Sequence, residues 1–181
     1  MTPAIIEIWE CCSSCNRMEP SQPSAPPTPP VQPAYSFQCL VSDYFHYCGQ
    51  NYLVAVDRYS NWLIVEEAAG GSSGLITALR PVFVTYGISD EMTSDGGPEF
   101  QSHKTKTFLQ DWVVNHHTSS VAFPHSNCRA EDGVKIVQRL ITDITDTEGR
   151  LDNNKFQHAM LQYHNTPDRE THLSPAMCIF G

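Results

Sequence analysis

The stretch FQCLVSDYFHYCGQNYLVAVDRYSNWLIVEE, residues 37–67, decides the fold of this chain. It holds three apolar runs, rich in aromatic and β-branched residues, at residues 37–47, 52–57 and 62–67. The short polar segments CGQN and RYSN separate these runs. Apolar runs of this length between turn residues predict β-strands, and turns this short join antiparallel neighbours. The sequence therefore predicts an antiparallel meander of three strands.

Beyond the meander, the pattern changes to helices that alternate with short strands. The segment GGSSG, residues 70–74, predicts a break that leads into a helix. Apolar residues at helical spacing mark the helices, and Pro81 is an awkward residue inside the first of them. The order βββαβαβα predicts an α/β fold, with a mixed sheet and helices on its faces. The predicted elements are helix 75–86, strand 91–94, helix 104–114, strand 116–119, a helix that begins near Ala130, and helix 153–164.

The first 35 residues differ in composition from the rest of the chain. Eight of the 13 prolines fall within this segment. A proline run of this density predicts an extended connector and neither helix nor sheet. We therefore expect two parts, a tail at residues 1–35 and one globular domain at residues 36–181, which is an ordinary size for a single core.

Composition narrows the classes of function. Eleven Lys and Arg stand against 20 Asp and Glu, which gives a net charge of −9. Broad phosphate binding relies on basic patches, so this balance argues against a polybasic nucleic-acid binder. It leaves open an enzyme that meets nucleic acid through metal ions. No apolar stretch approaches the roughly 20 residues of a membrane span, and we see no targeting signal. We therefore expect an intracellular protein with no membrane partner and with reduced cysteines.

Three acidic residues stand where a metal site would need them. Asp43 lies inside the first predicted strand, where an ionised carboxylate among apolar neighbours is costly unless something neutralises it. Asp95 follows the fourth strand and precedes two glycines, and Glu131 opens the third helix. If the fourth strand lies beside the first, Asp43 and Asp95 can face each other across neighbouring strands, and a helix start packed at that edge would bring Glu131 to the same point. Converging acids repel one another unless divalent cations lie between them, and Mg²⁺ favours such oxygen ligands.

Each of these acids also has a structural interpretation. Asp95 can serve the glycine turn that follows it, and Glu131 can stabilise the positive end of its helix by about 0.3–1 kcal/mol. Asp43 is the hardest of the three to explain in this way. A fourth acid, Asp57, is predicted to be structural, because aspartate commonly caps a turn such as the one before Ser60.

The sequence around these acids carries a family resemblance. Asp43, Asp95 and Glu131, with 35 residues between the second and the third, resemble the catalytic triad of retroviral and retrotransposon integrases. Residues 36–181 as a whole look like the integrase catalytic core of gypsy-type long-terminal-repeat retrotransposons. The strings that carry this resemblance are VSDYF, YLVAVDRYSNW, TYGISDEMTSDGGPEF, FPHSNCRAE, LQYHNTPD and LSPAMCIFG.

The resemblance implies a fold, a reaction and its partners. The fold would be RNase H-like, with a five-stranded mixed sheet flanked by helices. The reaction would be DNA integration by metal-dependent polynucleotidyl transfer, in which 3′-end processing with water precedes strand transfer by a DNA 3′-hydroxyl. Two Mg²⁺ or Mn²⁺ ions would be the cofactors, with Asp43 on both, Asp95 on one and Glu131 on the other. The implied partners are the DNA of the retroelement ends, the target DNA and further copies of the chain, in the nucleus.

We expect the DNA contacts to surround the third acid. Lys135 lies one helical turn after Glu131 and can meet a phosphate from the same face, although a solvated helix lysine has the same spacing. The family commonly has a base seven residues after the glutamate, and here that position is Gln138. The residues that we predict to contact DNA are Ser126, Asn127, Arg129, Lys135 and Arg139.

The tail contains half of a zinc motif. Cys12 and Cys15 resemble the end of the His-His-Cys-Cys zinc module that precedes integrase cores. A structural zinc site needs four ligands, and no histidine occurs before His46. We therefore interpret residues 1–35 as a remnant of that module with a proline-rich linker, and we expect Cys12 and Cys15 to bind no zinc on their own.

Departures from the family pattern support a second hypothesis. Where the family commonly has arginine, this chain has His164 and His117, and Asp132 adds an acid beside Glu131. Lost bases and added acids weaken contact with a polyanion. The alternative is a catalytically decayed, domesticated or relic integrase-fold module that acts only in nucleic-acid or protein interaction.

Overall fold

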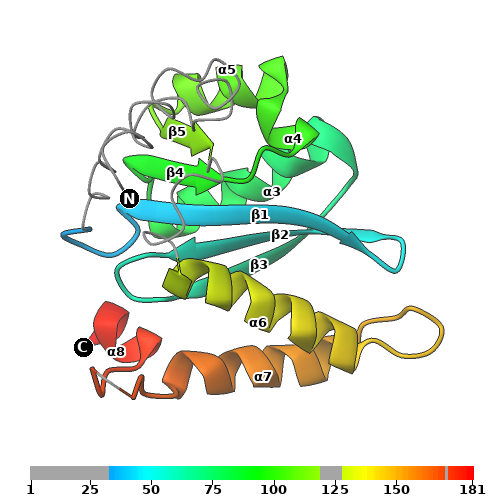
Figure 1. Ribbon diagram of the computed structural model, residues 1–181, viewed down its shortest axis with the longest axis vertical. Coiled ribbons are helices and arrows are strands. Elements are labelled where there is room, and N and C mark those ends of the chain that lie inside the picture. Colours follow the sequence, from blue (N-terminus) through cyan, green and yellow to red (C-terminus); the bar gives the residue numbers. More distant parts are fainter. Residues whose placement is uncertain (1–32, 119–127, 170) are drawn as a thin grey trace, which may run out of the picture.

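A five-stranded mixed sheet forms the centre of the computed structural model, which describes residues 33–118, 128–169 and 171–181, with residues 128–131 described by backbone alone. Its strands are β1 (Cys39–Tyr47), β2 (Gln50–Asp57), β3 (Leu63–Ala68), β4 (Glu91–Ser94) and β5 (Asn115–Thr118). Their order across the sheet is β3-β2-β1-β4-β5 (Figure 1). The first three strands pair antiparallel, whereas β4 and β5 continue the sheet in parallel. The predicted meander and mixed sheet are confirmed.

Helices cover both faces of this sheet. They are α3 (Gly71–Tyr86), α4 (Pro98–Gln101), α5 (His103–Asp111), α6 (Cys128–Ile144), α7 (Asn153–Asn165) and α8 (Pro175–Phe180). Figure 1 shows α3, α4 and α5 on one side of the sheet and α6 and α7 on the other, with α8 beside the end of α7. Because α3 crosses the sheet between β3 and β4, β4 can pair with β1 in parallel.

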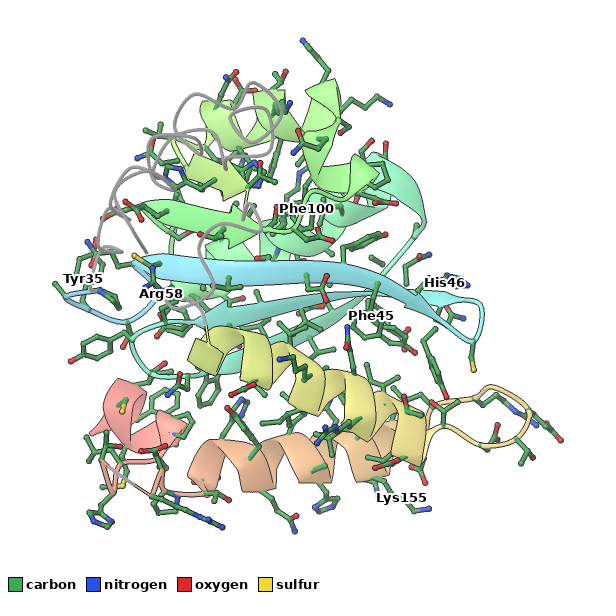
Figure 2. The ribbon with its side chains drawn as sticks, viewed as in Figure 1. Tyr35, Phe45, His46, Arg58, Phe100 and Lys155 are labelled. Carbon is green, nitrogen blue, oxygen red and sulfur yellow. The ribbon has the colours of Figure 1, made fainter. Side chains whose placement is uncertain are left out.

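The alternation of side chains along β1 separates two hydrophobic cores. Leu40 packs in the core beneath α3, together with Phe100 of α4, whereas Val41 and Phe45 belong to the core beneath α6. Figure 2 shows Phe45 on the α6 side of β1 and Phe100 on the opposite side of the sheet. Successive side chains of a strand point to opposite faces. Asp43, which stands between Val41 and Phe45, therefore lies on the α6 face.

The start of α3 differs from the sequence prediction. The helix begins at Gly71, so most of the segment GGSSG is helical. Gly71 has a φ of +76°, where residues with a Cβ are strained. A Cβ on Gly74 would collide with the carbonyl oxygen of Ala69. Gly71 and Gly74 therefore allow a tight turn from β3 into α3. Pro81 is tolerated on the exposed face of the helix, where water can replace the lost hydrogen bond.

Two short helices, α4 and α8, are absent from the sequence prediction. Both have a proline in their first turn. The Oγ of Ser174 caps α8 by accepting a hydrogen bond from the N–H of Met177 at 3.2 Å. Serine followed by proline is a readable helix start, but α8 spans six residues and shows no apolar repeat to support that signal. The bounds of β4 agree with the prediction, and the other elements agree within a few residues.

The segment before β1 is attached to the domain. The hydroxyl of Tyr35 donates a hydrogen bond to Oδ2 of Asp90, just before β4, at 2.8 Å. Residues 1–32, with Cys12 and Cys15, lie outside the described residues, so the division at residue 35 stays a prediction. Among the helices of the described ranges, none is both long enough and apolar enough to cross a membrane.

Candidate active site

Asp43 lies in the middle of β1, the central strand, on the face that α6 covers. It is half-buried, and both of its oxygens accept a hydrogen bond. Oδ1 accepts from the main-chain N–H of Tyr44 at 2.9 Å, and Oδ2 accepts from the side-chain amide of Gln138 at 3.1 Å. An ionised carboxylate can accept about four hydrogen bonds. Within the described residues, about half of the accepting capacity of Asp43 is therefore unused.

Asp95 is the first residue after β4. Ser42 of β1 pairs with Ser94 of β4 in parallel register, so Asp43 and Asp95 follow at corresponding positions of neighbouring strands. Asp95 is exposed, and its Oδ1 accepts the N–H of Gly97 at 3.1 Å. Asp95 therefore serves the glycine turn, as one interpretation of the sequence predicted. This hydrogen bond uses only one of its two carboxylate oxygens.

The negative charge of Asp95 acts on the carboxylate of Asp43. Burial is the largest cause that raises the pKa of Asp43, and the negative charge of Asp95 raises it further. The hydrogen bond from the N–H of Tyr44 lowers it. A raised pKa means that the folded protein disfavours the charged form of this acid. A hard divalent cation would relieve this penalty, and carboxylate oxygens are the ligands that Mg²⁺ prefers.

Glu131, the third predicted acid, belongs to α6, but its side chain lies outside the described residues. The helix is held close to the sheet two residues later. A Cβ on Gly133 would lie 2.8 Å from Cδ2 of Leu63, a distance at which the atoms overlap. Among the side chains that are described, no three His, Cys, Asp or Glu residues form a group that could hold a metal ion. The convergence of Glu131 with Asp43 and Asp95 therefore stays a prediction.

The predicted DNA contacts have different surroundings. Lys135 is exposed, and its Nζ lies 3.6 Å from Oδ1 of Asp132, one turn earlier on α6. An exposed ion pair of this kind contributes little to stability, but it places an acid beside the predicted phosphate contact. Arg139 is exposed on the same helix. The predicted contacts that lie outside the described residues are Ser126, Asn127 and the side chain of Arg129.

Two contacts near the acids were not predicted from the sequence. One is the hydrogen bond from Gln138 to Asp43. The other lies behind Asp95: Ser94 Oγ donates to the carbonyl oxygen of Asp95 at 2.9 Å, and Nε2 of His116 is 2.8 Å from that Oγ. Because the hydroxyl proton goes to the carbonyl, His116 is the donor to Oγ, and burial lowers the pKa of its imidazole. No sequence signal marks either contact, since each depends on how two elements pack.

Asp57 has the structural role that the sequence predicts. It is fully buried at the end of β2. Its Oδ1 accepts the N–H groups of Phe37 at 2.9 Å and Tyr59 at 3.3 Å, and its Oδ2 accepts the N–H and the hydroxyl of Ser60 at 3.0 and 2.6 Å. These bonds close the turn between β2 and β3 and attach it to the segment before β1. The prediction that Asp57 caps this turn is confirmed.

His164 takes part in packing, which the sequence did not indicate. Its ring stacks on Trp62, with centroids 3.6 Å apart and planes inclined by 6°. Its Nε2 lies 3.0 Å from the carbonyl oxygen of Leu63. A carbonyl can only accept, so Nε2 carries the hydrogen. The side chain joins the end of α7 to the start of β3. The expected loss of a phosphate contact at this position stays a prediction.

A cavity of about 680 Å³ lies beside the start of α6. It is bounded by the turn between β2 and β3, the start of α6 and helix α8, with Tyr59, Asp132 and Met177 in its lining. Neither Asp43 nor Asp95 contributes to it. Asp43 and Asp95 therefore lie outside this cavity, whereas Asp132 and Gly133, which follow Glu131 on α6, belong to its lining.

Known protein families identify the chain. The integrase core domain matches residues 34–124, which is just over half of the chain and includes both Asp43 and Asp95. This chain belongs to the integrase core domain family. The family resemblance expected from the sequence is confirmed.

Curated relatives of this integrase core are retroelement proteins and an uncharacterised protein. The uncharacterised protein, from Caenorhabditis elegans, is 31% identical over 131 residues, which are 71% of this chain and 10% of the relative. The Pol polyprotein of Feline endogenous virus ECE1 is 26% identical over 140 residues, 75% of this chain and 13% of the relative. The Gag-Pol polyprotein of Baboon endogenous virus is also 26% identical, over 75% of this chain and 8% of the relative. This chain thus spans about a tenth of the length of the curated relatives it matches.

Solved integrase structures share the fold of this integrase core. A simian T-cell lymphotropic virus intasome, in complex with a PP2A regulatory subunit, aligns with a TM-score of 0.72 at 18% identity and covers 100% of this chain and 67% of its own. The HTLV-2 integrase catalytic core domain in complex with magnesium (dimeric form) gives a TM-score of 0.60 at 16% identity, over 80% and 97% of the two chains. The BIV integrase catalytic core domain gives 0.62 at 14% identity, over 77% and 91%. The predicted RNase H-like fold is confirmed.

Proposed function

We propose that this chain is the catalytic core of a retroelement integrase that cuts and joins DNA by metal-dependent polynucleotidyl transfer. The observation that carries the proposal is the pair of acids on neighbouring strands, Asp43 in the middle of β1 and Asp95 directly after β4. Burial and the neighbouring charge of Asp95 raise the pKa of Asp43, so the fold keeps together two carboxylates that repel each other. An arrangement that costs stability and leaves accepting capacity unused fits a cation site better than a structural one.

The chemistry of the donor set fits the proposed cofactor. Asp43, Asp95 and Glu131 would hold two Mg²⁺ or Mn²⁺ ions, because carboxylate oxygens are hard ligands. Bound ions of this kind supply activation of the attacking oxygen and stabilisation of the leaving oxygen. The similar HTLV-2 core domain, in complex with magnesium, supports this choice of metal.

The residues of this chain would bind and orient the DNA. Lys135 and Arg139 lie exposed on α6, the helix that also carries Glu131. We include Ser126, Asn127 and Arg129, just before Glu131 in the sequence, among the contacts to the DNA end. The nucleophile would be the oxygen of a water molecule or of a DNA 3′-hydroxyl, so no side chain has to form a covalent intermediate.

The proposal extends to the assembly and the location of the protein. Retroelement ends and target DNA would be the partners, and the chain would act as a homo-oligomer in the nucleus, without a membrane. The intasome and the dimeric core domain among the similar structures support these partners. The catalytic core would comprise residues 36–181, preceded by a tail at residues 1–35 whose Cys12 and Cys15 bind no zinc on their own.

A DNA cleavage and joining assay tests the proposal. The purified chain should nick or join oligonucleotide duplex ends with Mg²⁺ or Mn²⁺, and EDTA should abolish the activity. Asp43→Asn should slow the reaction at least about 100-fold, the loss typical when electrostatic stabilisation of the transition state is removed. The matched control is Asp111→Asn, the same change at the exposed end of α5, which should leave the rate unaltered. Activity in EDTA, or an Asp43→Asn variant as active as the wild type, would contradict the proposal.

The second candidate is an integrase-fold interaction module without catalysis. The ion pair between Lys135 and Asp132 favours it, since an acid lies beside the predicted phosphate contact. The net charge of −9 also favours it. This candidate predicts DNA or protein binding with no metal-dependent turnover, and no change in binding when Asp43 is replaced by asparagine.

A further inference from the structure

The hydrogen bond between Gln138 and Asp43 joins the two elements that carry the candidate site. Gln138 is half-buried on α6, and Asp43 is half-buried on β1. The amide Nε2 donates to Oδ2 at 3.1 Å across 95 positions of sequence. The other oxygen, Oδ1, is bonded to the N–H of Tyr44, the next residue along the chain. Among the described residues, the donor to Asp43 from outside β1 is therefore Gln138.

The helix that carries the amide of Gln138, α6, is packed firmly against the sheet. Val137 and Ile141, neighbours of Gln138 on α6, are fully buried in the core between this helix and the sheet. Gly133 lets the same helix approach β3 closely, because a Cβ there would overlap Leu63. A side chain that projects from a fixed backbone loses less freedom when it forms a hydrogen bond. The contact can therefore restrict the carboxylate of Asp43 before any metal binds.

The chemistry of the donor matters as much as its position. An amide N–H carries no net charge, so it orients the carboxylate and leaves its negative charge intact. A cation bonded to the same oxygen would compete with a divalent ion for the negative charge of Asp43. An outer contact that orients a ligand in this way commonly changes metal affinity by about 10- to 100-fold.

We propose that Gln138 is a positioning residue that holds Asp43 in one orientation for metal binding through the bond from Nε2 to Oδ2. This inference rests on the proposed function, because it assumes that Asp43 is a metal ligand. Gln138 would orient the carboxylate of Asp43, in addition to any contact that it makes with DNA.

Metal affinity of the full chain tests the inference without any activity assay. The dissociation constant of Mn²⁺ can be measured by electron paramagnetic resonance for the wild type, Gln138→Met and Gln157→Met. Methionine keeps the length of the side chain and removes the amide. Gln157 is exposed on α7, and its side-chain amide donates a hydrogen bond to Asn153 one turn earlier, so it is the matched control. We expect Gln138→Met to raise the Mn²⁺ dissociation constant about 10-fold and Gln157→Met to leave it unchanged.

A double-mutant cycle in EDTA separates this role from a general loss of packing. Gln138→Met should change the melting temperature by a different amount in the wild type and in Asp43→Asn, because the variant replaces the charged acceptor. Equal Mn²⁺ affinity in Gln138→Met and the wild type would overturn the inference, and so would an additive cycle. If the wild type binds no Mn²⁺, the proposed function fails, and the positioning role fails with it. If the wild type binds Mn²⁺ and Gln138→Met binds it equally well, only the inference fails.

Discussion

Two aspartates in neighbouring strands have opposite surroundings. Asp57, at the end of β2, is fully buried and accepts four hydrogen bonds. Asp43, in β1, is half-buried, accepts two, and lies near the charge of Asp95. Both acids stand in apolar strands. The number of donors distinguishes a structural acid, whose oxygens the fold saturates, from a candidate ligand, whose accepting capacity the fold leaves partly unused, and the charge of Asp95 adds to the cost at Asp43.

The largest effect that we expect is on stability, from Asp57→Asn. Each oxygen of Asp57 faces at least one main-chain N–H, so either orientation of the asparagine amide places its NH₂ against a donor. Leaving buried donors unpaired should lower the free energy of unfolding by about 2–4 kcal/mol. Urea denaturation monitored by circular dichroism would measure this. An unchanged midpoint would mean that the four bonds do not stabilise the turn.

The same substitution at position 43 should have the opposite sign and a smaller size. Asp43→Asn removes a carboxylate whose charge is disfavoured by burial and by Asp95. In EDTA the variant should therefore melt at a higher temperature than the wild type. Mn²⁺ should raise the melting temperature of the wild type and leave that of the variant unchanged. If Asp43→Asn melts lower in EDTA and responds to Mn²⁺ as the wild type does, the two aspartates do not differ in the way described.

The pH dependence of stability should distinguish the wild type from Asp43→Asn. Because the pKa of Asp43 is raised in the folded state, the folded protein binds its proton more tightly than the unfolded chain does. The contribution of Asp43 to the free energy of unfolding therefore falls as pH rises from about 4, the pKa of the unfolded chain, through the raised pKa. The difference between wild type and variant, measured by urea denaturation in EDTA at a series of pH values, should show this fall. A difference that is constant with pH would contradict the raised pKa.

The smallest effect concerns DNA binding. Gln138→Lys adds a positive charge at the position where the family commonly has a base. It should strengthen DNA binding and steepen the slope of log affinity against log salt by about 0.9, the value for one added phosphate contact. Fluorescence anisotropy with a labelled duplex, in EDTA and at several salt concentrations, would measure it. Gln157→Lys adds the same charge on the exposed face of α7, and an equal gain there would show that the effect is not local to the site.

The parts of the fold that depend on local pattern could be predicted from the sequence. Apolar runs and turn residues predict the meander. Asp43 lies within β1 and Asp95 directly after β4, so the two acids are predicted to be neighbours if β4 pairs with β1. The spacing of Asp132 and Lys135 on one helix also allows their ion pair to be anticipated. These features need no knowledge of how helices lie on the sheet.

The remaining features depend on packing, which the sequence does not show. Whether Gln138 reaches Asp43 depends on the rotation of α6 about its axis and on its height above the sheet. The height depends in turn on Gly133, whose lack of a side chain matters only because Leu63 lies opposite. His164 likewise contacts residues that are distant in sequence. Its ring stacks on Trp62, and its Nε2 bonds to the carbonyl of Leu63, 101 positions away.

The parallel pairing of β1 with β4 has a consequence for the order of folding. Strands β1 to β3 are joined by short turns, with two residues, Cys48 and Gly49, at positive φ between β1 and β2. Contacts that are local in sequence form early, whereas β4 meets β1 only after α3 has crossed the sheet. Asp43 and Asp95 therefore come together late, when most of the sheet already exists. We expect their repulsion to act mainly after the transition state, so that Asp43→Asn slows unfolding more than it speeds refolding in stopped-flow experiments.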